Sequence, residues 1–211
     1  MKNSLGIIVV FILIFTAIHA QKTKIMTIKT QKNNSIETAT FAGGCFWCTE
    51  AIFQELKGVK SVVSGYSGGT IKNPSYREVV KGRTGHAEAI QITFNPKEIS
   101  FIDLLDAFFS THNPTTLNQQ GYDVGTQYRS VVFYHNDAQK EAAEKMIKNL
   151  TKAQVYDAKI VTEVVAFTDF YMAEEYHQDY YTNNKNQPYC ENVINPKLRK
   201  FLKNYATKLK E

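Results

Sequence analysis

The sequence predicts an α/β (α+β) sandwich of two layers, with a ferredoxin-like split βαβ core in which a mixed sheet carries helices on one face. Segments with strand or helix periodicity follow one another in the order strand, helix, strand, strand, helix, strand, which is typical of this fold class. Two long segments without periodicity, residues 68–85 and 113–127, interrupt that order. Loops of this length in a compact domain usually build a functional site.

The first half of the predicted core is a strand, a helix and a second strand. Residues 37–42 alternate and are β-prone, so we expect a strand that ends at a pair of glycines. A helix over residues 45–56 follows, because its apolar side chains fall on one face, and Gly58 is placed to stop it. Residues 59–66 form the next predicted strand, which runs into a Ser-Gly-Gly turn.

The second half of the core shows the same signals. Residues 86–94 alternate between two faces and end at Asn95-Pro96, which predicts a third strand. Ser100 is a suitable N-cap for a helix that continues to Phe109. The remaining predicted elements are a strand at 128–134, an amphipathic helix at 137–151, a β-branched strand at 160–165 and a last helix that starts near Pro196.

The first residues have the three parts of a secretory signal peptide. Lys2 precedes an uncharged run from Leu5 to Ile18, and Ala20 is a small residue suited to cleavage. The run is shorter than the roughly 20 residues of a membrane-spanning helix, so we expect the mature chain to begin near Gln21. A retained N-terminal membrane anchor or a buried helix is the alternative.

The composition indicates a signal peptide at residues 1–20, a flexible lead-in at 21–36 and a single folded domain at 37–211. The net charge of +5 is modest, and the lysines cluster in the lead-in and the C-terminal tail, which argues against a nucleic acid partner. The chain has three cysteines. Because this number is odd, a framework of structural disulfides in an exported protein would leave one thiol free for chemistry.

The segment Gly43-Gly44-Cys45-Phe46-Trp47-Cys48 places a cysteine just after a predicted strand and at the start of a predicted helix. Unpaired N–H groups and the helix dipole at such a position stabilise a thiolate, so Cys45 is the predicted nucleophile. Phe46 and Trp47 provide an apolar wall beside the sulfur. We therefore expect a small, apolar and electrophilic substrate.

Glu88 lies on the same face of its predicted strand as Ile90 and Ile92. A carboxyl on an apolar face binds its proton more tightly and can act as a general acid. The alternative is a glutamate at a strand end that reaches solvent, and the sequence leaves both open. Tyr76 and His86 are expected near the same end of the sheet.

The loop before residue 128 is dense in hydrogen-bonding groups between glycines. Asp123 and Tyr128 could orient a polar substrate atom, although an aspartate in such a loop is more often a turn-former. His177 is expected either at the surface or behind the site. The chain has no second Cys-x-x-Cys and no close histidine pair, so we expect no metal site.

Cys190 closes the segment 186–190, which lacks periodicity and is expected to be mobile. A cysteine on such a tail could swing to an oxidised Cys45. The alternatives are a structural thiol and a partner in a static disulfide.

Four motifs along the chain are Gly44-Cys45-Phe46-Trp47, Tyr76-Arg77-Glu78-Val79, Gly85-His86-Ala87-Glu88-Ala89 and Gly125-Thr126-Gln127-Tyr128-Arg129-Ser130. In this order they resemble the A-type peptide methionine sulfoxide reductases, and the resemblance covers residues 40–190. Four separate motifs in the right order are far more specific than any one of them alone.

The resemblance implies reduction of methionine sulfoxide, of the S epimer only, in oxidised proteins or as the free amino acid. It implies that Cys45 attacks the sulfoxide sulfur, that Phe46 and Trp47 hold the methyl group, and that Glu88 gives a proton to the sulfoxide oxygen. The residues implied as hydrogen-bonding support are Tyr76, Asp123 and Tyr128.

By the same resemblance, a Cys45 sulfenic acid forms and condenses with a second thiol to an intramolecular disulfide. No bound cofactor is implied. An external thiol reductant, either a thioredoxin-like protein or dithiothreitol, restores the thiols. Dependence on electrons delivered through a membrane favours the periplasm for such an exported enzyme, and we expect a monomer.

Many relatives have glycine after the Phe-Trp pair, where this chain has Cys48. Two thiols therefore compete to resolve the Cys45 sulfenic acid. Cys48 is one helical turn away and is constrained for a disulfide inside a regular helix. Cys190 matches the family's C-terminal resolving cysteine in its Tyr-Cys context. Our hypothesis is that Cys190 resolves first and that Cys48 then receives the disulfide.

Two other functions compete with this one. A general dithiol oxidoreductase could use Cys45 and Cys48 in the thioredoxin manner, but the chain lacks a cis-proline signature and Glu88 would have no role. An exported metal-binding module, such as a copper carrier, could use Met172 and His177, but a carrier needs no acidic donor. Metal content and turnover of methyl sulfoxides with dithiothreitol would separate the three.

Overall fold

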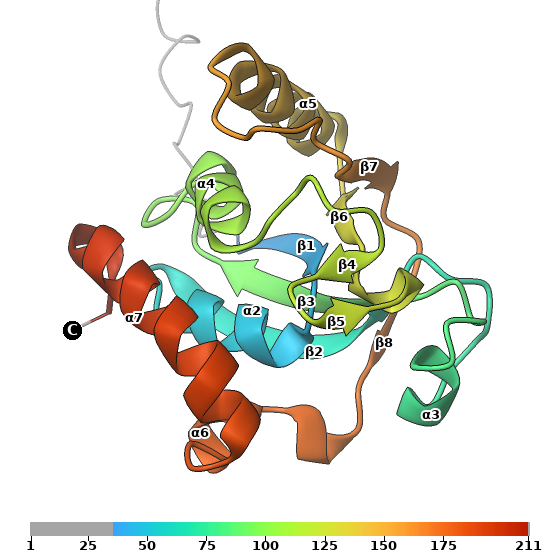
Figure 1. Ribbon diagram of the computed structural model, residues 1–211. Coiled ribbons are helices and arrows are strands. Elements are labelled where there is room, and N and C mark those ends of the chain that lie inside the picture. The colour runs from blue at the N-terminus through green and yellow to red at the C-terminus, as the bar shows by residue number, and fades with distance from the viewer. Residues whose placement is uncertain (1–35, 211) are drawn as a thin grey trace, which may run out of the picture. The chain divides into compact units, whose positions relative to one another are not determined.

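A six-stranded sheet forms the centre of the computed structural model, which describes residues 36–210 (Figure 1). The strand order is β7-β6-β1-β3-β2-β8. Neighbouring strands are antiparallel except β6 and β7, which are parallel, so the sheet is mixed. The predicted signal peptide and nearly all of the predicted lead-in lie outside the described residues. Within residues 36–210, no helix is long and apolar enough to cross a membrane.

The strands form where β-branched and aromatic residues alternate with small or polar ones. They are β1 at Glu37–Gly43, β2 at Val59–Ser67, β3 at Ala87–Phe94, β6 at Ser130–Tyr134, β7 at Glu163–Ala166 and β8 at Phe170–Met172. A separate hairpin joins β4 (Gln119–Gln120) to β5 (Asp123–Val124). In the β2–β3 register Tyr66 lies opposite Glu88.

The helices are α2 at Phe46–Phe53, α3 at Tyr76–Val79, α4 at Phe101–Thr111, α5 at Asp137–Lys152, α6 at Tyr180–Asn183 and α7 at Asn195–Asn204. Ser100 caps α4 as predicted: its Oγ accepts the N–H of Asp103 at 3.1 Å, and the Asp103 carboxylate accepts the N–H of Ser100. Short 3-10 turns span Thr126–Tyr128, Glu175–His177 and Ala206–Lys208, and a π-helix at Cys190–Ile194 leads directly into α7.

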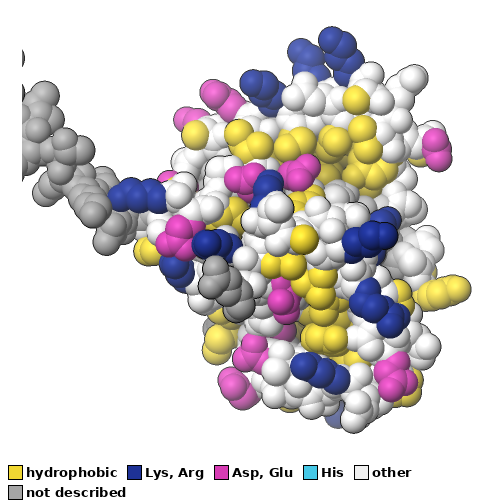
Figure 2. All heavy atoms as spheres, turned by 90° about the vertical axis from the view of Figure 1, so that its left-hand side faces the viewer, with side chains coloured by type: hydrophobic (Ala, Val, Ile, Leu, Met, Phe, Trp, Pro, Cys, Tyr) yellow, Lys and Arg dark blue, Asp and Glu magenta, His cyan; other side chains and the backbone are white. Residues whose placement is uncertain are grey.

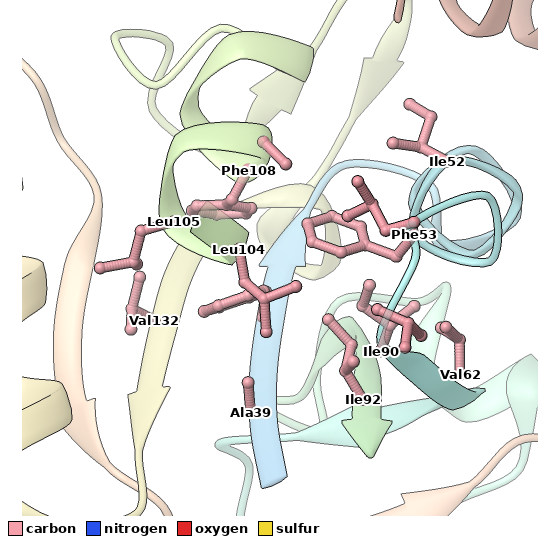
Figure 3. Close-up of a cluster of buried hydrophobic side chains, with 14 of the residues drawn as sticks. Ala39, Ile52, Phe53, Val62, Ile90, Ile92, Leu104, Leu105, Phe108 and Val132 are labelled. Atoms are coloured by element: carbon pink, nitrogen blue, oxygen red, sulfur yellow. The ribbon is translucent and has the colours of Figure 1, made fainter. Parts of the chain in front are cut away.

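The main hydrophobic core lies between one face of the sheet and helices α2 and α4 (Figure 3). The core side chains that the close-up labels are Ile52 and Phe53 of α2, Leu104, Leu105 and Phe108 of α4, and Ala39, Val62, Ile90, Ile92 and Val132 of the strands. The rings of Phe41 and Phe108 stack with centroids 5.0 Å apart. Because each fully buried large side chain contributes about 1.5–3 kcal/mol, this core fixes α2, and with it Cys45, against the sheet.

The opposite face of the sheet carries a second, smaller cluster, formed by Ala42, Ala87, Ala89, Val131 and Phe133. Side chains of a strand alternate between its two faces. Glu88 therefore lies on the α2 side of β3 together with Ile90 and Ile92, in the register that the sequence predicts.

Two predicted elements have different ends in the structure. Helix α2 ends at Phe53 instead of residue 56, because Leu56 forms an isolated bridge with Leu209. Strand β7 begins at Glu163 instead of residue 160, because the N–H of Val161 donates to the carbonyl of Pro114.

The two long predicted loops contain short elements that the periodicity did not reveal. Residues 68–85 include α3, and residues 113–127 include the hairpin of β4 and β5. The strand predicted from residue 128 begins at Ser130, because Thr126–Tyr128 forms a 3-10 turn. Strand β8 and helix α6 were not predicted either.

The face that carries α4 and α7 shows hydrophobic side chains in strips between charged side chains of both signs (Figure 2). A cavity of about 700 Å³ lies between the C-terminal end of α4 and α7, where its lining includes His112, Tyr156, Lys197 and Tyr205. None of the three cysteines lines it. Cys45 lines a second, smaller cavity instead.

Candidate functional site

A cavity of about 210 Å³ gathers the predicted site residues. Its lining is Cys45, Phe46, Trp47, Tyr76, Glu88, Asp123, Tyr128 and Tyr189. These residues come from the start of α2, from α3, β3 and β5, and from two turns that are far apart in the sequence. All seven residues predicted to contact a substrate therefore lie together, and Tyr189 joins them.

The turn before α2 delivers the Cys45 thiol to the cavity. Gly44 has a φ of +86°, and a Cβ at this position would lie 2.6 Å from the Gln120 side chain, so only glycine fits. Cys45 is the N-cap residue of α2, and its carbonyl accepts the N–H of Cys48 at 3.1 Å. The thiol therefore lies at the start of the helix, as the sequence predicts.

Glu88 lies buried beside this turn. Only 2% of the residue is exposed, so the alternative that its side chain reaches solvent is wrong. Its Oε2 accepts the N–H of Phe46 at 3.1 Å. Burial raises the pKa of Glu88 to about 8, although the Phe46 N–H acts in the opposite direction. The side chain is therefore a protonated carboxylic acid at neutral pH.

The three thiols share one buried cluster with Ala51 and Ile194. Burial is the main cause that raises the pKa of Cys45, with the hydrogen bond to Cys48 acting in the same direction. The same hydrogen bond lowers the pKa of Cys48 to about 7. The helix start alone therefore does not make Cys45 the thiolate, because burial opposes its ionisation and the two thiols titrate as a pair.

Cys190 is fully buried, with 0% of the residue exposed. The sequence predicted a mobile segment, whereas Cys190 begins a π-helix that packs against α2, because the Cys190 and Ile194 side chains fill the cluster around Cys48. Burial raises the pKa of Cys190. It does not line the cavity, but it belongs to the same buried cluster as Cys45 and Cys48.

Tyr189 connects the thiol cluster to the hairpin of β4 and β5. Its hydroxyl donates to Oδ2 of Asp123 at 2.8 Å and lies 3.9 Å from Sγ of Cys48. Asp123 therefore points into the cavity instead of closing a turn in the hairpin. The sequence predicted Asp123 as a site residue but not Tyr189. The sequence signal that could have identified Tyr189 is its position directly before Cys190.

The aromatic wall of the cavity is held from behind. The Trp47 indole stacks on the Tyr180 ring with centroids 3.6 Å apart and planes at 7°. The Trp47 Nε1–H donates to Nδ1 of His177 at 3.1 Å. His177 is buried and its ring also lies 5.1 Å from that of Phe46, so of the two predicted positions the one behind the site is correct and the surface position is not.

Tyr76 occupies the first position of α3, where a capping box between Ser75 and Glu78 closes the turn. The carboxylate of Glu174 accepts the N–H of Tyr76 at 2.9 Å and the hydroxyl of Tyr66 at 2.9 Å. Burial raises the pKa of Tyr76 to about 12. Its hydroxyl is therefore a stable hydrogen-bond donor.

Tyr128 lies in the 3-10 turn before β6, and burial raises the pKa of its hydroxyl as well. Together with Glu88 and Tyr76 it gives the cavity three protonated oxygen donors. Such a set can stabilise negative charge on a substrate oxygen and supply a proton to it. Among residues 36–210, no three His, Cys, Asp or Glu side chains are grouped so that they could hold a metal ion.

Sequence comparison relates the chain to one family. The family described as Peptide methionine sulfoxide reductase matches residues 37–210. A peptide methionine sulfoxide reductase MsrA from Sulfolobus acidocaldarius is 54% identical over 173 residues, which cover 82% of this chain and 97% of that protein. One from Deinococcus radiodurans is 53% identical over 181 residues, covering 86% of this chain and 88% of that protein.

Comparison with solved structures gives the same relation. Mxr1 from Saccharomyces cerevisiae in reduced form has a TM-score of 0.67 and 36% sequence identity, over 74% of this chain and 89% of that chain. Methionine sulfoxide reductase A of Corynebacterium diphtheriae has a TM-score of 0.65 and 32% identity, over 72% of this chain and 76% of that chain. Sequence and fold therefore lead to the same group of proteins.

Proposed function

Since the chain belongs to the peptide methionine sulfoxide reductase family, we propose that Cys45 and Glu88 carry out its reaction. The enzyme is a peptide-methionine (S)-S-oxide reductase, which converts methionine sulfoxide to methionine with electrons from thiols. This assignment replaces the two alternative functions, a general dithiol oxidoreductase and a metal-binding module. The observation that carries the residue roles is the protonated Glu88 carboxyl beside the Cys45 turn, inside an aromatic-walled cavity.

The substrate binds with its methyl group against Phe46 and Trp47, because a methyl group bound to sulfur makes favourable contacts with aromatic rings of about 0.3–1.5 kcal/mol. Its oxygen points toward the three protonated donors of the cavity, which are Glu88, Tyr76 and Tyr128. Asp123 accepts the hydroxyl of Tyr189, and both residues line the same cavity. With the methyl group and the oxygen fixed, the two epimers exchange the peptide arm and the lone pair of the sulfur, so attack from the side of Cys45 selects one epimer.

In the reductase step, Cys45 attacks the sulfoxide sulfur and its proton passes to the Cys48 thiolate, which is hydrogen-bonded to it. Glu88 donates its proton to the oxygen while the sulfur–oxygen bond weakens. The oxygen is transferred to Cys45, which becomes a sulfenic acid, and methionine leaves. One thiol is thus oxidised by two electrons and one sulfoxide is reduced by two.

The contacts favour a different order of resolution from the one expected from the sequence: we propose that Cys48 resolves first. Cys48 lies one turn from Cys45 in the same buried cluster, and its N–H donates to the Cys45 carbonyl at 3.1 Å, whereas Cys190 reaches the cluster from a separate π-helix. The constraint of a regular helix does not apply to Cys45, because the N-cap residue has non-helical angles of φ −59° and ψ 125°. Attack by Cys48 releases water and forms the first disulfide.

Cys190, packed in the same cluster, then takes over the disulfide by attacking Cys48, which frees Cys45 for another reaction. A thioredoxin-like protein, or dithiothreitol in its place, reduces the disulfide that results. No bound cofactor takes part.

A burst experiment without reductant tests these roles. The wild-type chain should release a second equivalent of methionine, because the transfer to Cys190 regenerates the Cys45 thiol. Cys190→Ser should stop after one equivalent with a disulfide between Cys45 and Cys48, and Cys45→Ser should release none. Methionine from Cys45→Ser would contradict the nucleophile, and two equivalents from Cys190→Ser would contradict the relay.

The organisation of the chain belongs to the same proposal. We propose one catalytic domain at residues 37–211, a cleaved signal peptide at 1–20 and a lead-in at 21–36 in a monomeric periplasmic enzyme. The order β6-β1-β3-β2, with α2 after β1 and α4 after β3, supports the split βαβ arrangement for the central four strands. Intact-mass measurement of the exported protein tests the cleavage: residues 1–20 should be missing.

A further inference from the structure

Glu50 is a second buried carboxyl near the site, and the reaction described above does not use it. It lies on α2 one turn after Trp47, and 1% of the residue is exposed. Its Oε2 accepts the main-chain N–H of Tyr180 at 3.3 Å, while Oε1 has no hydrogen-bond partner among the described residues. A buried carboxyl that is only half satisfied is unfavourable for stability, so a purely structural purpose explains it poorly.

Glu50 is connected to the aromatic wall of the cavity through one residue, Tyr180. Glu50 holds the backbone of Tyr180, and the Tyr180 ring stacks on Trp47 at 3.6 Å. Trp47 lines the cavity. We propose that Glu50 is a positioning residue for the reductase reaction, which holds Tyr180 against Trp47 and so sets the orientation of the wall that binds the substrate methyl group. This inference rests on the proposed role of Trp47.

The turn before α6 supports this role. Asp179 has a left-handed φ of 50°, and its carboxylate accepts the side-chain N–H of Gln54 at 2.7 Å. The segment is therefore attached to α2 at two places, by Gln54 at the end of the helix and by Glu50 in its middle. The Glu50 bond is the one between α2 and the Tyr180 backbone itself, whose carbonyl accepts the side-chain N–H of Asn184 at 2.9 Å, so Glu50 sets the position of Tyr180 relative to α2.

A carboxylate at residue 50 binds the Tyr180 N–H more strongly than an amide would, because hydrogen bonds to charged acceptors are roughly twice as strong as neutral ones. Burial raises the pKa of Glu50 to about 7, and the Asp179 charge acts in the same direction, while hydrogen bonds from the Asp179 backbone, the Ser64 side chain and the Tyr180 N–H act in the opposite one. A substantial fraction of the side chain is thus ionised at neutral pH.

The test uses Trp47, the single tryptophan of the chain, as a spectroscopic reporter. In Glu50→Ala, the emission maximum of the free protein should shift, and KM for a methionine sulfoxide peptide should rise by about tenfold or more, which corresponds to one lost hydrogen bond to a charged group. The value of kcat should stay within about twofold, because Glu50 does not touch the reacting atoms. Glu50→Gln, which keeps an acceptor, should give a rise of about threefold.

Tyr180→Leu removes the stacked ring and leaves the N–H that binds Glu50, so it should reproduce the emission shift and the higher KM. The double variant Glu50→Ala/Tyr180→Leu should add nothing, because both changes act through one contact. Glu55→Gln, the same type of substitution near the end of α2, is the matched control and should behave as wild type. If Glu50→Ala does not fold, Glu50→Gln and Tyr180→Leu carry the test.

An unchanged emission spectrum in the Glu50 variants overturns the inference, whatever the activity. A shifted spectrum with an unchanged KM also overturns it, and it places the error in the role of Trp47 rather than in the contact between Glu50 and Tyr180. The spectra are measured again in the Cys45→Ser background, where no turnover is expected. A shift there reports the contact between Glu50 and Tyr180 independently of the proposed reaction, so a failure of this contact is distinguished from a failure of the proposed function.

Discussion

The main-chain N–H of Phe46 donates a hydrogen bond of 3.1 Å to Oε2 of Glu88. Phe46 is the residue after Cys45, the proposed nucleophile, so one bond connects Glu88, the proposed proton donor on β3, to the turn that presents the thiol. The bond leaves the other carboxyl oxygen free to carry the proton. The relative position of the two reacting groups is therefore set by the backbone of α2 and the register of β3.

Removal of the Glu88 proton should slow the reductase step strongly. In Glu88→Gln the amide keeps the bond to Phe46 but has no proton to give, so the single-turnover rate should fall by about 10²–10⁴, the usual contribution of a general acid. Glu144→Gln, exposed on α5, is the matched control and should react at the wild-type rate. A rate for Glu88→Gln within a factor of three of wild type would contradict the assignment.

The reductase step should have a pH optimum. Its rate should fall as the pH rises through about 8, because Glu88 then loses the proton that it donates. It should also fall as the pH drops through about 7, because Cys48 then becomes protonated and cannot accept the proton of Cys45. Stopped-flow measurement of methionine release from pH 5 to 10 checks both limbs. A rate that still increases above pH 9 would exclude Glu88 as the acid.

Glu88 should also make the fold less stable in alkaline solution. Its pKa is raised from 4.5 to about 8, so the folded chain binds this proton more tightly than the unfolded chain. The stabilisation is complete below pH 4.5 and is lost as the pH rises through about 8. Glu88→Gln should therefore be more stable than wild type by about 4 kcal/mol at pH 8 and nearly equal at pH 4.5. Urea unfolding at both pH values measures this, and lower stability of the variant at pH 8 would be the contrary result.

His177 should report its own protonation through Trp47. Its Nδ1 accepts the indole N–H, so it must be unprotonated, and burial lowers its pKa below the usual 6.5 although the charge of Glu174 acts the other way. Trp47 emission in the wild type should therefore change as the pH falls below 6.5, and His177→Phe should lack this transition.

The same variant should raise KM about fivefold, through the loss of one hydrogen bond that fixes the indole. His135→Phe is the control, because the His135 ring stacks on Phe167 and does not contact Trp47. An acid transition that persists in His177→Phe would show that another group causes it.

The central strands and long helices could be predicted because each has a strong local signal. Alternation marks β3 and places Glu88 on the α2 face, and the capping box at Ser100 marks the start of α4. The short elements could not be predicted. Strand β8 has three residues, and it exists because it pairs with the edge of β2, which is a long-range contact that no local pattern records.

The candidate site was predicted where its chemistry has a sequence motif, and it was missed where the role depends on packing. Cys45, Glu88 and Asp123 stand in motifs, and they line one cavity. Tyr189 and the buried position of His177 follow from how the segment before α7 folds back on α2. The paired titration of Cys45 and Cys48 likewise depends on burial, which the helix position alone does not give.

The most direct test is to trap the oxidised nucleophile in the double variant Cys48→Ser/Cys190→Ser. This chain has Cys45 as its only thiol, so one turnover with a methionine sulfoxide peptide should release one equivalent of methionine and leave a sulfenic acid. Dimedone should then label Cys45 in the same amount as the methionine released. Methionine release without label on Cys45, or release of the same amount after Cys45→Ser is added, would show that another group takes the oxygen.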